Sequence, residues 1–191
     1  MDLDRLALLT QEAAERADAG PRGAGSAGPP KEKEAEETLA EAIERAGRYI
    51  AHRPRSERQV RDKLAGLSYD EATIDAAVAR LIELRLIDDS DFARRWIEER
   101  ARTKGKAPDV LVSELRARGV SREVAEEALA EVGLEEATQA LEVATKLLRR
   151  VLRFPLDEQG PRLYGLMRRR GFSHEHAEAG ARAVLPPEGW D

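Results

Sequence analysis

The chain has 191 residues, a formal net charge of −5 and no Cys. The absence of Cys excludes a disulfide framework, a thiolate zinc site, an iron–sulfur cluster and a cysteine nucleophile. The apolar runs are too short to span a membrane, and charges interrupt the apolar N-terminal residues, so we expect a cytoplasmic protein without a secretory signal. Aromatic residues make up only 4%, too few for a platform that stacks single-stranded bases. The acidic net charge argues against a nucleic-acid partner, unless the charges are unevenly distributed.

The first 35 residues differ in pattern from the rest of the chain. Leucines recur at helical spacing over residues 2–18, which predicts a marginal, isolated helix there. Residues 20–34 are rich in Gly, Pro, Ser and charged residues, and such a composition buries too little apolar surface to offset its ordering entropy. We therefore predict a mostly flexible N-terminal extension over residues 1–35.

Apolar residues recur every three or four positions from about residue 36 to residue 185, in nine successive runs. This period and the dominance of Ala, Leu, Glu and Arg predict nine helices and an all-α fold. No segment alternates with the period of a β-strand. The serines that precede helical runs are interpreted as helix caps rather than nucleophiles, with capping boxes at Ser56 and Ser68 and simple N-caps at Ser121 and Ser173.

One kind of junction recurs three times, in which a helix ends in Gly and is followed by an apolar residue and a Ser. The glycines are Gly66, Gly119 and Gly171, at spacings of 53 and 52 residues, and we expect each to be left-handed. Three helices fill each period, which predicts three tandem three-helix repeats that form an elongated, curved body. The alternative is a nine-helix bundle without repeat symmetry. The predicted repeats and the C-terminal tail are residues 36–87, 88–133, 134–185 and 186–191.

Basic residues gather in each repeat from its first helix into its second. The net charge is +3 over residues 53–63, +4 over 94–106 and +6 over 146–170, whereas the third helices tend to be acidic. Such cations ordinarily complement the helix dipole and pair with Glu one turn away. Alternatively, they form a basic stripe that follows a phosphate backbone through charge rather than stacking. The candidate DNA- or filament-binding residues are Arg53, Arg55, Arg94, Arg95, Arg102, Lys104, Lys106, Lys146, Arg149, Arg150, Arg153, Arg168, Arg169 and Arg170.

No motif for catalysis or for a cofactor is evident. The chain lacks the Gly-rich phosphate loop of nucleotide-binding proteins. His174 and His176 lie two residues apart at a predicted helix start, so they point in different directions, and no third metal ligand is evident. The acidic run 88–91 opens a helix, where the dipole favours carboxylate caps over a cation site. We therefore expect no metal, no cofactor and no enzyme activity, and we place Phe92 and Trp96 in the core.

Part of the second repeat resembles the RecX family, bacterial regulatory proteins that modulate the RecA recombinase. The resemblance rests on the run Leu86–Trp96, on Arg100 and Gly105, and on Glu114–Val120. It covers residues 38–185 and departs from the family pattern at Arg85, where the family has Gly. In the first repeat it extends to Arg53, Ser56, Val60, Lys63, Leu64 and the helix 74–84. The family-motif residues are Asp88, Asp89, Asp91, Phe92, Ala93, Trp96 and Arg100.

The resemblance implies tandem three-helix repeats and a role in the groove of the RecA filament on single-stranded DNA. Binding there would restrain strand exchange, ATP hydrolysis and coprotease activity. The expected partners are the RecA filament and, through weak electrostatic contacts, single-stranded DNA, with no membrane and with the chain as a monomer. Two alternatives are a helix-turn-helix-type transcriptional regulator, suggested by the helix pair 56–84, and a helical scaffold that binds only protein.

Overall fold

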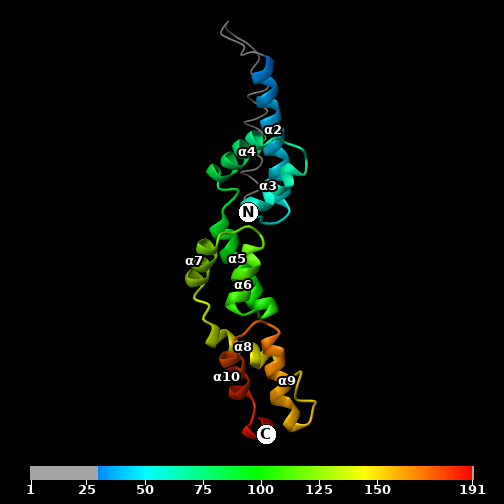
Figure 1. Ribbon diagram of the computed structural model, residues 1–191, viewed down its shortest axis with the longest axis vertical. Helices are drawn as coiled ribbons and strands as arrows, with labels where there is room; N and C mark the ends of the chain where they lie inside the picture. The colour runs from blue at the N-terminus through cyan, green and yellow to red at the C-terminus, as the bar shows by residue number, and fades with distance from the viewer. Residues whose placement is uncertain (1–29, 191) are drawn as a thin grey trace. The chain divides into compact units, whose positions relative to one another are not determined.

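In the computed structural model, which describes residues 30–190, every regular element is a helix (Figure 1). The predicted all-α fold is confirmed, and the helix predicted over residues 2–18 lies outside the described part of the chain. The residues fall into two compact units, of which the first ends at Asp89 and the second begins at Ser90. No helix between residues 30 and 190 is both long enough and apolar enough to cross a lipid bilayer.

The first unit is built from α2 (Pro30–Ala51), α3 (Glu57–Ala65) and α4 (Glu71–Glu83), with α4 packed against both other helices. α2 begins at Pro30, six residues before the predicted start of the helical region at residue 36. Pro is tolerated in the first turn, where its missing N–H has no partner to lose, and the Glu, Lys and Ala that follow are strong helix formers. The buried core residues include Ala42, Ala46, Ile50, Val60, Leu64, Ile74, Val78, Leu81 and Ile87.

The turn between α3 and α4 corrects two predictions, although the capping box at Ser56 is confirmed. Gly66 has a right-handed φ of −66°, and it is Ser68 that takes the left-handed φ of 66°. The N-cap of α4 is Asp70, whose carboxylate accepts hydrogen bonds from the backbone N–H of Thr73 at 2.9 Å and from its hydroxyl at 2.8 Å. A carboxylate is a stronger acceptor than a Ser hydroxyl, which explains why Asp70 takes the cap.

The second unit contains two groups of three helices. The middle helices are α5 (Asp89–Lys104), α6 (Pro108–Arg116) and α7 (Arg122–Val132), and the last helices are α8 (Glu136–Leu148), α9 (Leu156–Arg168) and α10 (His174–Val184). A short 3-10 helix, η1 (Pro187–Trp190), packs against α9. The middle core includes Phe92, Ala93, Ile97, Leu111, Leu115, Val120 and Ala125, and the last core includes Val143, Leu147, Val151, Leu163, Met167, Phe172 and Ala177.

The predicted helix ends in the second unit are mostly confirmed. Ser121 and Ser173 cap α7 and α10, and Gly119 and Gly171 have left-handed φ values of 89° and 93°. The apolar period of α8, however, continues to Leu152, whereas the helix ends at Leu148. The chain then turns, and Leu152 is exposed, as are three other residues of the periodic runs, Leu67 and Ile82 in the first unit and Leu141 in the second.

The middle and last helices of the second unit are locked together by polar and steric contacts. The Ala107 N–H donates to the Arg170 carbonyl at 3.0 Å, and the buried Gln139 amide donates to the Ala101 carbonyl at 3.0 Å. Gly171 allows the closest approach, since a Cβ there would lie 2.1 Å from Cγ2 of Val110. The two triplets therefore share one packed interface, which sets the positions of the cations around it.

Candidate functional site

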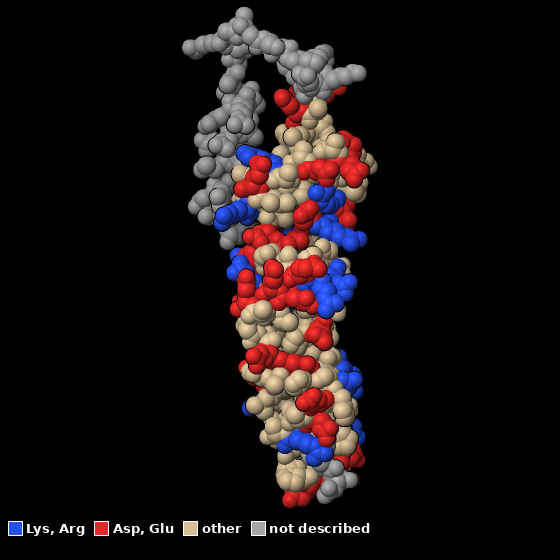
Figure 2. All heavy atoms as spheres, turned by 60° about the vertical axis from the view of Figure 1, so that its left-hand side comes forward, with Lys and Arg blue, Asp and Glu red and all other residues tan. Residues whose placement is uncertain are grey.

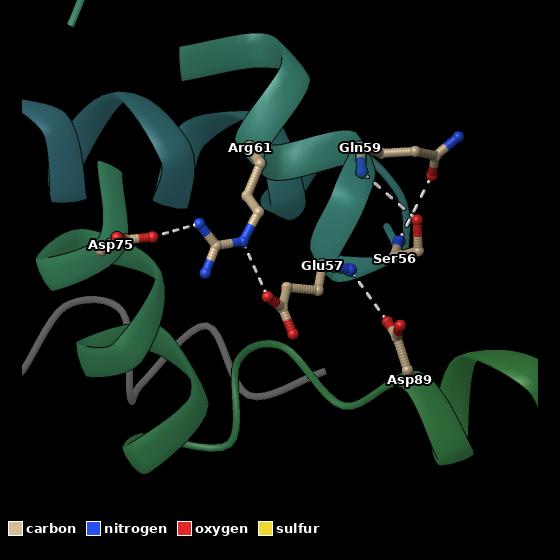
Figure 3. A network of polar contacts seen from close by, with 6 residues as sticks. All are labelled: Ser56, Glu57, Gln59, Arg61, Asp75 and Asp89. Atoms are coloured by element: carbon tan, nitrogen blue, oxygen red, sulfur yellow. Dashed lines mark hydrogen bonds and ion pairs between the residues drawn. The ribbon is translucent and has the colours of Figure 1, made fainter. Parts of the chain in front are cut away.

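The acidic run at the start of α5 organises the N-terminus of α3 (Figure 3). Oδ1 of Asp89 accepts a hydrogen bond from the Glu57 N–H at 2.8 Å, beside the capping box of Ser56 and Gln59. Burial raises the pKa of the Asp89 carboxyl, while the bond from Glu57 opposes that rise. The sequence predicted a capping role for the run 88–91, and Asp89 does cap a helix, although its carboxylate satisfies a free N–H of α3 rather than of α5.

Arg61 ties α3 to α4 next to this cap (Figure 3). Its Nε donates to Oε1 of Glu57 at 2.7 Å, and its Nη1 donates to the carboxylate of Asp75 on α4. The positive charge of Arg61 offsets the negative charges of Glu57 and Asp75. Together with Asp89, these contacts fix the start of α3 and the loop before it, which carries Arg53 and Arg55.

The other acidic residue of the motif, Asp91, neutralises neighbouring cations. It pairs with Arg94 at 3.2 Å and with Arg95 at 2.8 Å, and Arg94 also pairs with Glu131 on α7 at 3.6 Å. Lys146 pairs with Glu142 at 3.3 Å. For three of the candidate cations, Arg94, Arg95 and Lys146, the ordinary role of a helix-surface ion pair therefore holds. Asp88 is exposed.

The aromatic residues of the motif pack in or beside the middle core, and Trp96 also contacts charged side chains at the surface. Phe92 and Ala93 are buried in the middle core, as predicted for Phe92, whereas Trp96 is half-buried at its edge. The guanidinium carbons of Arg100 and Arg118 lie 4.3 Å and 3.7 Å from the centre of the indole. The indole Nε1 also donates to Oε2 of Glu114 at 3.2 Å. Trp96 thus joins the core to a layer of charged side chains, so that Arg100 is held by stacking rather than by an ion pair.

A first group of cations lies in the first unit. Arg55 stacks on Tyr49 with its guanidinium carbon 4.0 Å from the ring centre, and Nζ of Lys63 is 5.9 Å from the same centre. Burial lowers the pKa of Arg55, and the positive charge of Arg53 adds to this effect. Nε of Arg55 is buried without a hydrogen-bond partner, and none of the three cations forms an ion pair within residues 30–190. We call Arg53, Arg55 and Lys63 the loop cations.

A second group surrounds the interface between the middle and last helices. Lys106 precedes Ala107, whose N–H bonds to the carbonyl of Arg170, so the backbones of Lys106 and Arg170 are adjacent. Burial lowers the pKa of Arg170, and the positive charges of Arg150 and Arg169 lower it further. No ion pair reaches any of these four cations in the described chain. We call Lys106, Arg150, Arg169 and Arg170 the junction cations.

The remaining candidates are dispersed. Arg168 donates to the carbonyl of Phe172, and Arg153 lies 5.0 Å from the centre of the Phe154 ring. Arg102, Lys104 and Arg149 are exposed. On the face drawn in Figure 2, acidic side chains lie among the basic ones in each unit. The structure thus gathers some of the predicted cations into two groups, while others are spread out or neutralised.

The sequence named most of these residues but not what they do together. Tyr49, on which Arg55 and Lys63 converge, was not singled out at all, and nothing indicated that Glu114 and Arg118 would meet Trp96. Cations spaced irregularly around a loop leave no periodic signal, so only the local net charge pointed to them. Within residues 30–190, no group of three or more His, Asp or Glu side chains is arranged to hold a metal ion.

Two family models match the chain, and they cover different helices. The model described as RecX, first three-helix domain, matches residues 42–81, and the model described as RecX, second three-helix domain, matches residues 88–129. The second match contains all of the family-motif residues, from Asp88 to Arg100. These matches confirm the resemblance that the motif suggested.

Curated relatives and solved structures agree with the family models. Proteins named Regulatory protein RecX from Corynebacterium efficiens and Amycolatopsis mediterranei are 35% and 34% identical to the chain, and the matches cover 74% and 75% of it and 70% and 83% of the relatives. One from Levilactobacillus brevis is 35% identical, but the match covers only 53% of that relative. The crystal structure of RecX from Lactobacillus salivarius matches with a TM-score of 0.66 over 78% of this chain and 97% of that one. At 22% identity this likeness shows the fold alone.

Proposed function

The chain belongs to the RecX family of regulatory proteins, and from this premise we propose that it binds the RecA–single-stranded DNA filament and mainly inhibits it. Binding would reduce RecA-catalysed ATP hydrolysis, strand exchange and coprotease activity. The chain supplies no catalytic chemistry of its own in this proposal, and its effect comes from occupying the filament. Family membership is the observation that carries the proposal.

The arrangement of charge supports binding to a polyanionic assembly. The loop cations and the junction cations, in different units, have no ion pairs within the described residues, although carboxylates outnumber cations in the chain as a whole. Cations left unpaired on such a protein are available to a partner. Two separate groups on one chain also allow two simultaneous contacts, and linked contacts bind more tightly than either one alone.

The organisation of the chain in this proposal follows the three-helix repeats 36–87, 88–133 and 134–185. Each repeat would present its own surface to the filament, and a single monomer in the cytoplasm would be the active form. Acidic side chains on α7, such as Glu127, would meet basic filament surfaces and set the orientation of binding.

The helix-turn-helix alternative receives less support from α4, the second helix of the pair. A recognition helix presents cations or amides to the bases and phosphates of the major groove. The exposed residues of α4 include three carboxylates and one guanidinium, from Glu71, Asp75, Glu83 and Arg80. Such a surface repels the DNA backbone, and we therefore favour the RecA filament as the partner.

The proposal is tested by RecA ATPase and strand-exchange assays on single-stranded DNA. The wild-type chain at stoichiometric excess should lower both rates, and Arg53→Gln/Arg55→Gln should weaken this inhibition by about tenfold or more, since each charge-assisted contact contributes about 1.5–3 kcal/mol. The matched control is Arg45→Gln/Arg48→Gln, which makes the same change in charge at two arginines already paired with Glu41 and Glu44. Unchanged RecA rates with the wild-type chain would contradict the proposal.

A further inference from the structure

The junction cations have the features of a preformed anion site rather than of a solvated helix surface. Surface cations on helices usually pair with a carboxylate one turn away, as Arg122 does with Glu126 at 2.7 Å and Arg182 does with Glu178 at 2.9 Å. The four junction cations have no such pairs within the described residues. Instead, the positive charges of Arg150 and Arg169 act on Arg170, and such like-charge repulsion raises the free energy of the unbound protein.

The backbone holds these cations together although they come from distant parts of the sequence. Lys106 follows α5, Arg150 follows α8, and Arg170 follows α9. The hydrogen bond from the Ala107 N–H to the Arg170 carbonyl, at 3.0 Å, joins two of these segments. Next along the chain, Gly171 contacts Val110 so closely that no side chain fits between them. Leu147 and Val151, which flank the turn at Arg150, are buried in the same core as Met167 and Phe172. The three segments are therefore held by packed backbone.

Arginine in such a setting is suited to phosphate. The planar guanidinium binds two phosphate oxygens at once, and it keeps its charge when partly buried. Arg170 is half-buried, and its Nη1 donates to the Leu166 carbonyl at 3.0 Å, which fixes the plane of the group. Its remaining donors are available to a ligand. A protein partner would ordinarily require an apolar centre to its interface, and the apolar Val110 beside this group is already engaged by Gly171.

We propose that Lys106, Arg150, Arg169 and Arg170 form one phosphate-binding site, built across the packed interface of the middle and last helices, that holds consecutive phosphates of a single nucleic-acid strand. This inference deepens the proposed function, on which it rests, since it names the nucleic-acid contact of a filament-binding protein. Binding is electrostatic and independent of base sequence, in keeping with the scarcity of aromatic side chains.

The test measures the binding of a fluorescent oligothymidylate to the full chain, without RecA, over a series of salt concentrations. The variant Arg150→Gln/Arg169→Gln/Arg170→Gln should bind more weakly, and its slope of log K against log salt should be shallower by about 2, at ~0.7 per lost phosphate contact on a single strand. The matched control, Arg45→Gln/Arg122→Gln/Arg182→Gln, removes the same charge from ion-paired positions and should keep the wild-type slope. Equal slopes for the two variants would overturn the proposal.

Further arms separate the site from structural and nonspecific effects. Arg150→Lys/Arg169→Lys/Arg170→Lys keeps the charge and should restore the salt slope with weaker affinity, since a Lys does not bind two phosphate oxygens at once. The wild type and the Gln variant should bind a strand with neutral methylphosphonate linkages with equal affinity. Displacement of the strand by polyglutamate as effective as by unlabelled strand would contradict the assignment to nucleic acid. This assay contains no RecA, so it tests the DNA site separately from the proposed function. If the chain bound the strand here but did not inhibit RecA in the ATPase assay, only the proposed function would be contradicted.

Discussion

The contact between Gly171 and Val110 gives a quantitative prediction about the interface on which the junction cations depend. Substituting Gly171→Ala adds a Cβ at a left-handed φ of 93°, 2.1 Å from Cγ2 of Val110. The left-handed backbone costs Ala about 1–2 kcal/mol, and overpacking costs about 1–3 kcal/mol more. We therefore expect Gly171→Ala to lower the free energy of unfolding of the second unit by about 2–5 kcal/mol.

A second substitution separates the two contributions. Val110→Ala removes Cγ2 and leaves Cβ of residue 110, which lies 3.4 Å from the new methyl group, at ordinary contact distance. In the double variant the overpacking cost should disappear, so about 1–3 kcal/mol should be recovered while the backbone cost remains. The control is Gly133→Ala, because Gly133 has a left-handed φ of 66° and an added methyl group would meet nothing within 4 Å. It should cost only about 1–2 kcal/mol, regardless of Val110.

The assay is urea denaturation followed by tryptophan fluorescence, which reports on the second unit because both tryptophans, Trp96 and Trp190, belong to it. The reasoning is refuted if Gly171→Ala costs no more than Gly133→Ala, or if Val110→Ala fails to recover stability in the double variant. Either result would mean that the middle and last helices are not locked at this contact.

Three further predictions concern the first unit. Burial raises the pKa of Asp89, so its carboxyl holds a proton more tightly in the folded chain than in the unfolded one. The stability of the unit should therefore fall as pH rises through the raised pKa. Asp89→Asn keeps the acceptor for Glu57 and should remove this pH dependence, measured by amide exchange of α3. Ser56→Ala should cost about 1–2 kcal/mol in the same exchange experiment, and a cost below about 0.3 kcal/mol would show that the capping box contributes little. Arg85→Gly should stabilise the unit by about 1 kcal/mol, because Arg85 has a left-handed φ of 54°; a loss of stability would contradict this.

The sequence predicted the helices well because their apolar periods and cap residues are local signals. The caps at Ser56, Ser121 and Ser173 follow from a hydroxyl placed directly before a helical run. The failure at Ser68 has the same origin, since Asp70 competes locally and wins with a stronger acceptor. The left-handed φ of Arg85 is a conformation that Gly adopts more readily, which is consistent with the Gly that the resemblance led us to expect there.

Contacts between distant segments could not be predicted in this way. Nothing local indicates that Asp89 caps α3 instead of α5, because its partner lies 32 residues earlier in the chain. The period of α8 likewise gave no sign that the helix ends at Leu148 and leaves Leu152 exposed. Net charge identified the basic regions but did not distinguish the paired Lys146 from the unpaired Arg150. That distinction depends on which carboxylates the fold brings within reach.

The most direct test of the central claim is binding of the chain to preassembled RecA filaments, with and without single-stranded DNA, over a series of salt concentrations. The proposed function predicts saturable binding to the RecA–DNA filament that is tighter than binding to naked DNA or to RecA alone, and that weakens as salt rises. Equal affinity for naked DNA and for the filament, or no binding to the filament at low salt, would contradict it.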